Sequence, residues 1–250
     1  MKQGATSSWF LRYRPVRQPR LRLFCYSYAG GSAGIFRNWT QFLDPSIELC
    51  ACQFPGREQR FGERPLSDFP LLMASLLNAL RPLLDLPYAC FGHSLGALVM
   101  FEVTQQARRA ELPLPVALFP SGCRAPHLPD PDPPIHALPD EAFFAELAHL
   151  NGTPREVLEH AELMQLMLPM LRADFTLAET YTYQAQPPLS CPISVFGGRE
   201  DHEVQLSSLS AWRQHTTGPF QIRLFEGDHF FLHEASSSIV EAMNDDLRSS

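Results

Sequence analysis

The pentapeptide GHSLG at residues 92–96 contains residue types that can carry out nucleophilic chemistry. It follows an apolar run at 88–91 and precedes a helical pattern at 95–110. A serine on a tight turn between strand and helix, with a glycine two residues to either side, is typical of a nucleophile elbow. Ser94 is therefore the predicted nucleophile and acyl transfer the predicted chemistry. The alternative is a serine that only caps the helix.

A serine hydroxyl is a poor nucleophile until a base accepts its proton, so a histidine is expected later in the chain. His229 lies in the segment FEGDHFF at 225–231, just after the last predicted strand and just before the last predicted helix. No other histidine is placed on such a late loop, and we predict that His229 is the base. His202 is the nearest rival, while His93 is expected to pack inside the elbow.

The carboxylate that orients the histidine is expected on the loop after the preceding strand, in the segment GGRED at 197–201. Glu200 and Asp201 both qualify. Asp201 is favoured because the G-x-x-D spacing from Gly198 is common at this loop. Asp228, although adjacent to His229, is interpreted as a turn residue.

Acyl transfer also needs donors for the oxygen that becomes negative in the tetrahedral intermediate. The backbone N–H of Leu95, which directly follows the predicted nucleophile, is one candidate. The glycine-rich loop YAGGSA at 28–33 follows an early apolar run, and we predict that the N–H of Ala29 is the second donor. The alternative is that the glycines of this loop form only a tight turn.

Strands and helices must alternate to place these loops at one edge of a sheet. Apolar strand-like runs alternate with helical patterns over most of the chain, which predicts an α/β fold with a mostly parallel sheet flanked by helices. The predicted strands are Leu21–Ser27, Ile47–Phe54, Tyr88–Phe91, Val116–Pro120, Ile193–Phe196 and Gln221–Phe225. The predicted helices are Phe36–Leu43, Phe69–Leu84, Leu95–Ala110, Val204–His215 and Phe231–Leu247. We expect residues 1–250 to form a single domain.

The alternation of strand-like runs and helical patterns is interrupted after Gly122 by a proline-rich segment and by helical patterns that continue to about Tyr183. These patterns are apolar on one side and contain three methionines, Met164, Met167 and Met170. We predict a helical lid, approximately residues 124–185, over the carboxyl edge of the sheet. The alternative is a helical subdomain that serves stability alone.

Composition and charge argue against several kinds of partner and site. The formal net charge of −7 and the isoelectric point near 5.7 argue against a nucleic-acid partner, which would require a basic surface. The six cysteines lie mostly in apolar runs and are expected to be buried free thiols, with no metal site. The chain contains no apolar run of membrane-spanning length and no signal peptide at its start, so the cytoplasm is the expected location.

These motifs together resemble the type II thioesterases that accompany nonribosomal peptide and polyketide synthases, members of the α/β-hydrolase superfamily. Further segments carry the resemblance along nearly the whole chain: FPGRE at 54–58, LPDEAFFAEL at 138–147, LPMLRADF at 168–175 and GDHFFL at 227–232. The family more often has Gly-Gly-His where this chain has Gly227-Asp228-His229. Arg57 in FPGRE could contact a phosphate or a carrier acid, or form a salt bridge with a neighbouring loop.

The resemblance implies a stand-alone editing enzyme that hydrolyses acyl groups from the phosphopantetheine arm of acyl or peptidyl carrier protein domains. It implies no cofactor, no membrane partner and a monomer. A medium-chain acyl thioesterase of fatty-acid synthesis, a general carboxylesterase and a product-releasing cyclase domain are alternative enzymes. A non-catalytic binder on the same scaffold is a further alternative, although no member of the predicted triad is missing. The start at Met1, with no remnant of a carrier domain, favours the separate editing protein.

Overall fold

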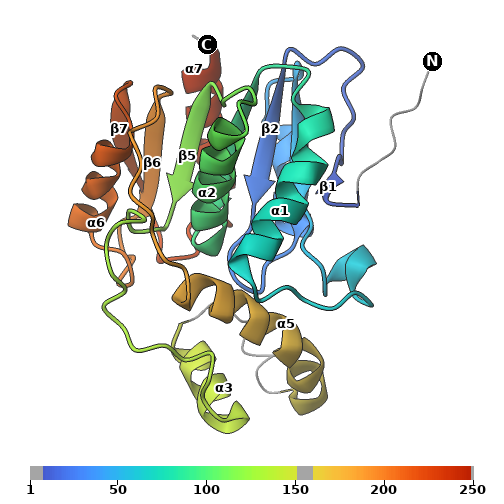
Figure 1. Cartoon of the computed structure of the whole chain (residues 1–250), viewed down its shortest axis with the longest axis vertical. Helices are drawn as coiled ribbons and strands as arrows, with labels where there is room; N and C mark the ends of the chain where they lie inside the picture. The colour runs from blue at the N-terminus through green and yellow to red at the C-terminus, as the bar shows by residue number, and fades with distance from the viewer. Residues whose placement is uncertain (1–7, 151–159, 249–250) are drawn as a thin grey trace.

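The computed structural model describes residues 8–150 and 160–248. Within them, seven strands form one sheet in the order β1-β3-β2-β4-β5-β6-β7 (Figure 1). The strands are β1 (Phe10–Leu11), β2 (Leu21–Tyr26), β3 (Ile47–Cys52), β4 (Tyr88–His93), β5 (Ala117–Ser121), β6 (Ile193–Gly198) and β7 (Phe220–Phe225). Neighbouring strands are parallel except for β1, which is antiparallel to β3. The predicted fold class, a mostly parallel sheet flanked by helices, is confirmed.

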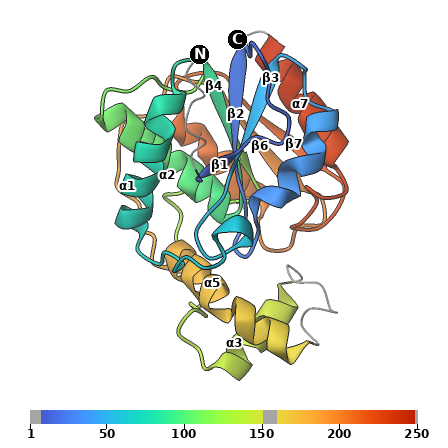
Figure 2. The same cartoon turned by 90° about the vertical axis from the view of Figure 1, so that its right-hand side faces the viewer.

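Helices cover both faces of the sheet. They are α1 (Phe69–Leu80), α2 (Leu95–Arg109), α3 (Asp140–His149), α5 (Ala161–Glu179), α6 (Leu206–Ser210) and α7 (Ser236–Arg248). Helices α1 and α2 pack on one face, whereas α7 and the 3₁₀ helix Ala33–Gln41 pack on the other (Figure 2). The sheet has an apolar core on each face, and successive side chains of β2 pack into opposite cores. Leu23 packs on the α7 side and Phe24 on the α1 side. Strands buried on both faces explain why the sequence shows continuous apolar runs.

Three differences from the sequence-based elements have physical reasons. Strand β1 was missed because two residues are too few to show an alternating pattern. The helix expected at Phe36–Leu43 is a 3₁₀ helix that starts earlier, at Ala33, where the Ser32 hydroxyl accepts the N–H of Gly34. The helix expected at Val204–His215 is divided into α6 and a 3₁₀ helix, Ala211–His215. Periodicity of apolar residues does not distinguish these helix types at such short lengths.

The segment between β5 and β6 leaves the sheet and carries α3 and α5. Both helices lie beyond the carboxyl ends of the parallel strands (Figure 1). Their facing sides form a separate apolar cluster that includes Phe143, Leu147, Met164 and Leu171. Residues 151–159, which belong to the predicted lid, lie outside the described residues.

All six cysteines are buried and free, in agreement with the sequence-based interpretation. They lie in or beside the central strands, with Cys25 in β2, Cys90 in β4 and Cys191 just before β6. Burial raises the pKa of their thiols, to about 11 for Cys191 and well above the ordinary value for Cys25 and Cys90. These side chains therefore pack as small apolar groups.

Candidate active site

Ser94 occupies the turn between β4 and α2. Its backbone has φ 53° and ψ −119°, a conformation that residues other than glycine rarely adopt. A hydrogen bond of 2.9 Å from its N–H to the carbonyl of Ser121 ties the turn to β5. The side chain is partly exposed at the carboxyl edge of the sheet. The backbone strain that is typical of a nucleophile elbow is therefore present at this residue.

The two glycines of GHSLG allow the close approach that this turn requires. A Cβ added to Gly92 would lie 2.2 Å from the carbonyl oxygen of Gly96, across the turn itself. A Cβ added to Gly96 would lie 2.2 Å from the carbonyl oxygen of Tyr26 in β2. Helix α2 can therefore start directly against β2 only because neither position has a side chain.

Asp201 and His229 meet because β6 and β7 are parallel neighbours whose carboxyl ends lie side by side. The N–H of Glu200 donates to the carbonyl of Gly227 at 3.0 Å and ties the two loops together. His229 Nδ1 lies 3.0 Å from Asp201 Oδ2. Because an ionised carboxylate can only accept, Nδ1 carries the proton of the neutral imidazole, and Nε2 is left as the acceptor.

The carboxylate of Asp201 is itself held in place. Its other oxygen, Oδ1, accepts the backbone N–H groups of Glu203 at 2.9 Å and Val204 at 3.1 Å. Its side chain is fully buried, and that of His229 nearly so. Burial alone would lower the pKa of His229, but the hydrogen bond that it donates to Asp201 and the charge of Glu203 outweigh this effect and raise that pKa above its ordinary value. The imidazole therefore sits in surroundings that stabilise its protonated form.

Ser94 and His229 lie in the same region, although no hydrogen bond joins them among the residues that the structure describes. The ring of His93, adjacent to Ser94 in the chain, has its centroid 5.2 Å from that of His229. Catalytic hydrogen bonds are often long before substrate binds and shorten in the complex. The structure thus joins Asp201 to His229 directly, and places Ser94 next to the residue that contacts His229.

The alternative candidates for the acid and the base lie in surroundings unlike those of Asp201 and His229. Glu200 and His202 are exposed. His93 is buried, with Nδ1 2.9 Å from the Ser121 hydroxyl, and burial together with nearby His229 lowers its pKa well below the ordinary value. Asp228 accepts the N–H of Phe230 at 2.8 Å through its side chain, as a turn residue does.

One predicted oxyanion donor, Leu95, lies in the elbow itself, and the other, Ala29, lies on the loop after β2. Leu95 is the first residue of α2, so its N–H has no acceptor within the helix. Ala29 follows β2, and among the described residues its N–H has no hydrogen-bond acceptor, whereas the N–H of Gly31, two residues further on, donates to the carbonyl of Tyr28 at 2.9 Å. An N–H that is not used within the fold remains available to a ligand.

A family model for the thioesterase domain matches residues 21–247. The chain belongs to this thioesterase family. Its members hydrolyse thioesters, and the protein is accordingly a hydrolase that acts on this class of bond.

Individual relatives match the thioesterase over nearly its whole length. The gramicidin S biosynthesis protein GrsT of Aneurinibacillus migulanus is 43% identical over 242 residues, which cover 97% of this chain and 94% of that protein. The thioesterase PikA5 of Streptomyces venezuelae is 38% identical over 240 residues, covering 96% of this chain and 85% of that protein. The solved structure of the type II thioesterase BorB from the borrelidin biosynthetic cluster has 37% identity and a TM-score of 0.86, covering 95% of this chain and 96% of that chain.

Two charged residues of the thioesterase site were missed by sequence reasoning. Glu203 places Oε2 3.7 Å from His229 Nε2, and Asp174 of α5 forms a buried ion pair with Arg57. For Asp174 a signal existed, because it lies three residues from both Leu171 and Leu177 and hence on the apolar face of the helix, where a charge requires a partner. For Arg57, the salt-bridge alternative is the one that the structure contains.

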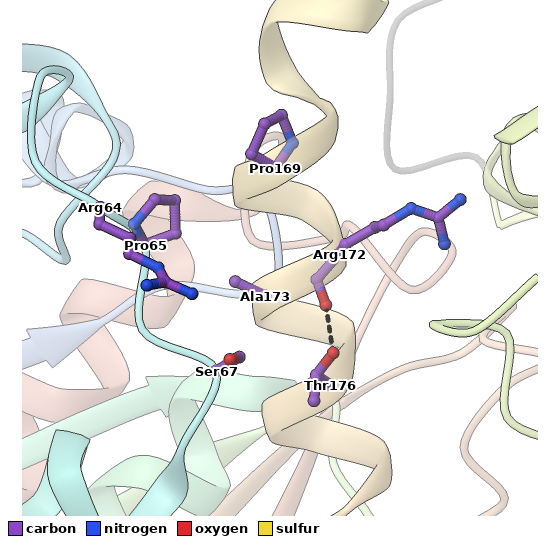
Figure 3. A pocket seen from close by; sticks show the side chains of 7 residues that line it. All are labelled: Arg64, Pro65, Ser67, Pro169, Arg172, Ala173 and Thr176. Atoms are coloured by element: carbon purple, nitrogen blue, oxygen red, sulfur yellow. Dashed lines mark hydrogen bonds between the residues drawn. The ribbon is translucent and has the colours of Figure 1, made fainter.

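A cavity of about 270 Å³ in the thioesterase lies between segment 64–67 and α5, away from the predicted catalytic residues (Figure 3). Figure 3 shows the Arg172 side chain extending to the side of α5 opposite Arg64. There Arg172 donates to the carbonyl of His136 and the carboxylate of Asp140, each at 2.6 Å. Arg64 and Arg172 therefore do not form a two-cation site in this cavity.

A second cavity, of about 380 Å³, borders the His229 loop of the thioesterase. Its lining residues are Glu200, Gly227, Asp228, Phe230, Phe231, His233 and Glu234. Among the described residues, no group of three or more His, Cys, Asp or Glu side chains could hold a metal ion. Over those same ranges, 8–150 and 160–248, no helix combines the length and apolar character needed to cross a membrane.

Proposed function

We propose that the protein is a stand-alone type II thioesterase that removes acyl groups from the phosphopantetheine arm of carrier proteins in a nonribosomal peptide or polyketide synthase. Ser94 is the nucleophile, His229 the base and Asp201 the residue that orients the base. The N–H groups of Ala29 and Leu95 form the oxyanion hole. The observation that carries this assignment is the Asp201–His229 hydrogen bond beside the strained Ser94 turn, in a chain of the thioesterase family.

In the first half of the reaction, Ser94 Oγ attacks the thioester carbonyl while His229 Nε2 accepts the hydroxyl proton. Asp201 keeps the proton of the neutral imidazole on Nδ1 and stabilises the imidazolium. The N–H groups of Ala29 and Leu95 stabilise the negative oxygen of the tetrahedral intermediate. The carbon–sulfur bond then breaks, and the imidazolium gives its proton to the departing sulfur, which leaves as a thiol.

In the second half, a water molecule attacks the Ser94 ester while Nε2 of His229 accepts one of its protons. The same two N–H groups stabilise the second tetrahedral intermediate. When the ester bond breaks, the proton passes to Ser94 Oγ, the acid leaves and the enzyme is regenerated. Every proton and bond is accounted for by the three side chains, water and substrate, and we propose that no cofactor takes part.

Residues 124–185 are the proposed lid. Helix α5 lies over the carboxyl edge of the sheet, and its side chains include Met164, Met167 and Met170. Methionine side chains are flexible and can repack around acyl chains of different shape, which suits an editing enzyme with tolerant specificity. We further propose that the protein is a cytoplasmic monomer whose partners are carrier proteins, not nucleic acid or membrane.

The decisive experiment measures release of a panel of acyl groups from several purified carrier proteins, with free acyl-CoA and soluble oxoesters as comparison substrates. The proposal requires the highest kcat/KM on acyl-carrier thioesters and tolerance of unlike acyl groups. Equal rates on oxoesters would indicate a general carboxylesterase. A strong preference for medium chains on a fatty-acid carrier would indicate the fatty-acid alternative.

A further inference from the structure

A buried ion pair connects the loop after β3 to the helix that covers the site. Arg57 Nη2 donates to Asp174 Oδ1 at 2.7 Å and Nη1 donates to Asp174 Oδ2 at 2.9 Å. The two side chains are only 5% and 1% exposed. Burying two charges has a large desolvation penalty, so a buried pair is weak evidence for stabilisation of the fold. Its other contacts indicate what it holds in place.

Both members of the pair also bind the backbone of the YAGGSA loop. Asp174 Oδ2 accepts the N–H of Gly30 at 2.7 Å, and Arg57 Nη1 donates to the carbonyl of Gly31 at 2.8 Å. Gly30 and Gly31 are the two residues after Ala29, whose N–H is the proposed oxyanion donor. The ion pair therefore fixes the loop on the carboxyl side of that donor.

A third hydrogen bond transmits this constraint to the donor itself. The N–H of Gly31 donates to the carbonyl of Tyr28 at 2.9 Å. The carbonyl of Tyr28 and the N–H of Ala29 belong to one planar peptide unit and point in opposite directions. Fixing Gly30 and Gly31 through Asp174 and Arg57 thus fixes the direction in which the Ala29 N–H points.

Helix α5 also packs directly on this loop. Gly30 has φ +80°, and a Cβ added there would lie 2.8 Å from Leu171 Cδ2, one helical turn before Asp174. Figure 2 shows α5 beneath the loops at the carboxyl ends of the strands. The helix thus contributes both an apolar contact and a charged contact to the same short turn.

We propose that Asp174, held by Arg57, is a positioning residue that aims the Ala29 N–H at the developing oxyanion, so that helix α5 is part of the oxyanion hole's support. This inference rests on the proposed function, in which Ala29 is an oxyanion donor. If the ion pair only stabilised the fold, a variant with an uncharged pair of similar volume would keep parental activity as long as it folded.

The test uses the double variant Arg57→Met plus Asp174→Leu, because replacing a buried ion pair by apolar side chains is often neutral for stability. Thermal unfolding, kcat and KM on an acyl-loaded carrier protein, and the Kd of an alkylboronic acid would be measured. The boronic acid forms a tetrahedral adduct with the serine and so reports on the oxyanion hole. We expect a folded protein whose kcat falls roughly 10- to 100-fold and whose boronic-acid Kd rises by a similar factor. KM should change much less.

Two controls separate this inference from the function on which it rests. Asp140→Asn breaks the ion pair between Asp140 of α3 and Arg172 of α5, which is more exposed than the Arg57–Asp174 pair, and should leave kcat unchanged. Ser94→Ala should be inactive; full activity there would refute the proposed function itself. If Ser94→Ala is inactive while the folded double variant keeps kcat within about threefold of the parent, only the positioning role is refuted.

A second variant decides the matter if the double variant does not fold. Arg57→Lys keeps the positive charge but cannot present the planar fork that reaches both Asp174 oxygens and the carbonyl of Gly31. We expect a lower kcat and weaker boronic-acid binding at nearly unchanged KM. Parental values of kcat and boronic-acid Kd in Arg57→Lys would overturn the inference.

Discussion

A carboxylate oxygen of Glu203 lies 3.7 Å from Nε2 of His229, while Asp201 holds Nδ1 of the same ring at 3.0 Å. The imidazole thus has a negative group at each nitrogen. The two carboxylates differ in exposure, since Asp201 is fully buried and the side chain of Glu203 is about one-third exposed. Burial raises the pKa of Glu203. The negative charge of its ionised carboxylate contributes to the raised pKa of His229.

Glu203→Gln should shift the acid limb of the pH–activity profile to lower pH. His229 must be neutral to accept a proton, so kcat/KM rises as pH increases through its raised pKa. Removing the Glu203 charge removes one of the groups that favour the imidazolium, and the rise should begin at lower pH. The measurement is kcat/KM from pH 5 to 9, with Glu200→Gln, an exposed carboxylate on the same loop, as the control. A limb that stays in place or moves to higher pH would contradict the prediction.

Ser94→Ala should abolish turnover with little loss of stability. The residual rate should lie at least roughly 10⁴-fold below that of the parent, because the acyl-enzyme can no longer form. Release of acyl groups from a carrier protein and thermal unfolding are the two measurements. Activity within tenfold of the parent would refute the assignment of the nucleophile.

Asp201→Asn should retain the fold but lower kcat by about 10⁴-fold, since an amide can stabilise the wrong tautomer of His229 and cannot stabilise the imidazolium. Single-turnover measurements should show slow acylation and slow deacylation alike, because His229 serves both halves of the reaction. A loss of less than tenfold would indicate that a different carboxylate orients the base.

Gly96→Ala should be destabilising by about 1–3 kcal/mol, because the added methyl group would overlap the carbonyl of Tyr26 and push α2 away from β2. Urea denaturation measures the free energy of unfolding. Gly62→Ala is the matched control, since an added Cβ there meets nothing within 4 Å. Equal stabilities of the two variants would argue against the close packing at the elbow.

The buried His215 should make the protein less stable as pH falls below neutrality. Burial, assisted by the nearby His127, lowers its pKa to about 4, whereas the unfolded chain titrates near 6.5. Between these values the unfolded state binds more protons, so the free energy of unfolding decreases as pH falls from about 6.5 towards 4. The pH dependence of Tm should be flatter in His215→Gln; an unchanged slope would contradict this account.

The parts of the site that could be predicted from sequence are those encoded locally. Ser94 was predicted from the glycines two residues away, and Asp201 and His229 were predicted from their places on loops that follow apolar strands. The hydrogen bond between Asp201 and His229 follows from the parallel pairing of β6 and β7, which the alternation of strands and helices already implies.

Contacts between remote segments were not accessible in this way. Arg57 and Asp174 are 117 positions apart, and their partnership depends on how α5 lies across the sheet, for which one sequence contains no local signal. Glu203 was missed for another reason, since only the direction of its side chain brings it towards Nε2 of His229. The two-residue strand β1 was too short for any periodicity to show.

The buried cysteine thiols can be used to measure how often the native sheet opens. Alkylating reagents attack thiolates, and burial raises the pKa of Cys50 and Cys123 to about 12, so neither ionises appreciably near neutral pH. Because the cysteines are buried in or beside the strands of the sheet, a reagent can reach most of them only after strands separate. The speed at which iodoacetamide is incorporated would therefore measure how often the native sheet comes apart, without any engineered label.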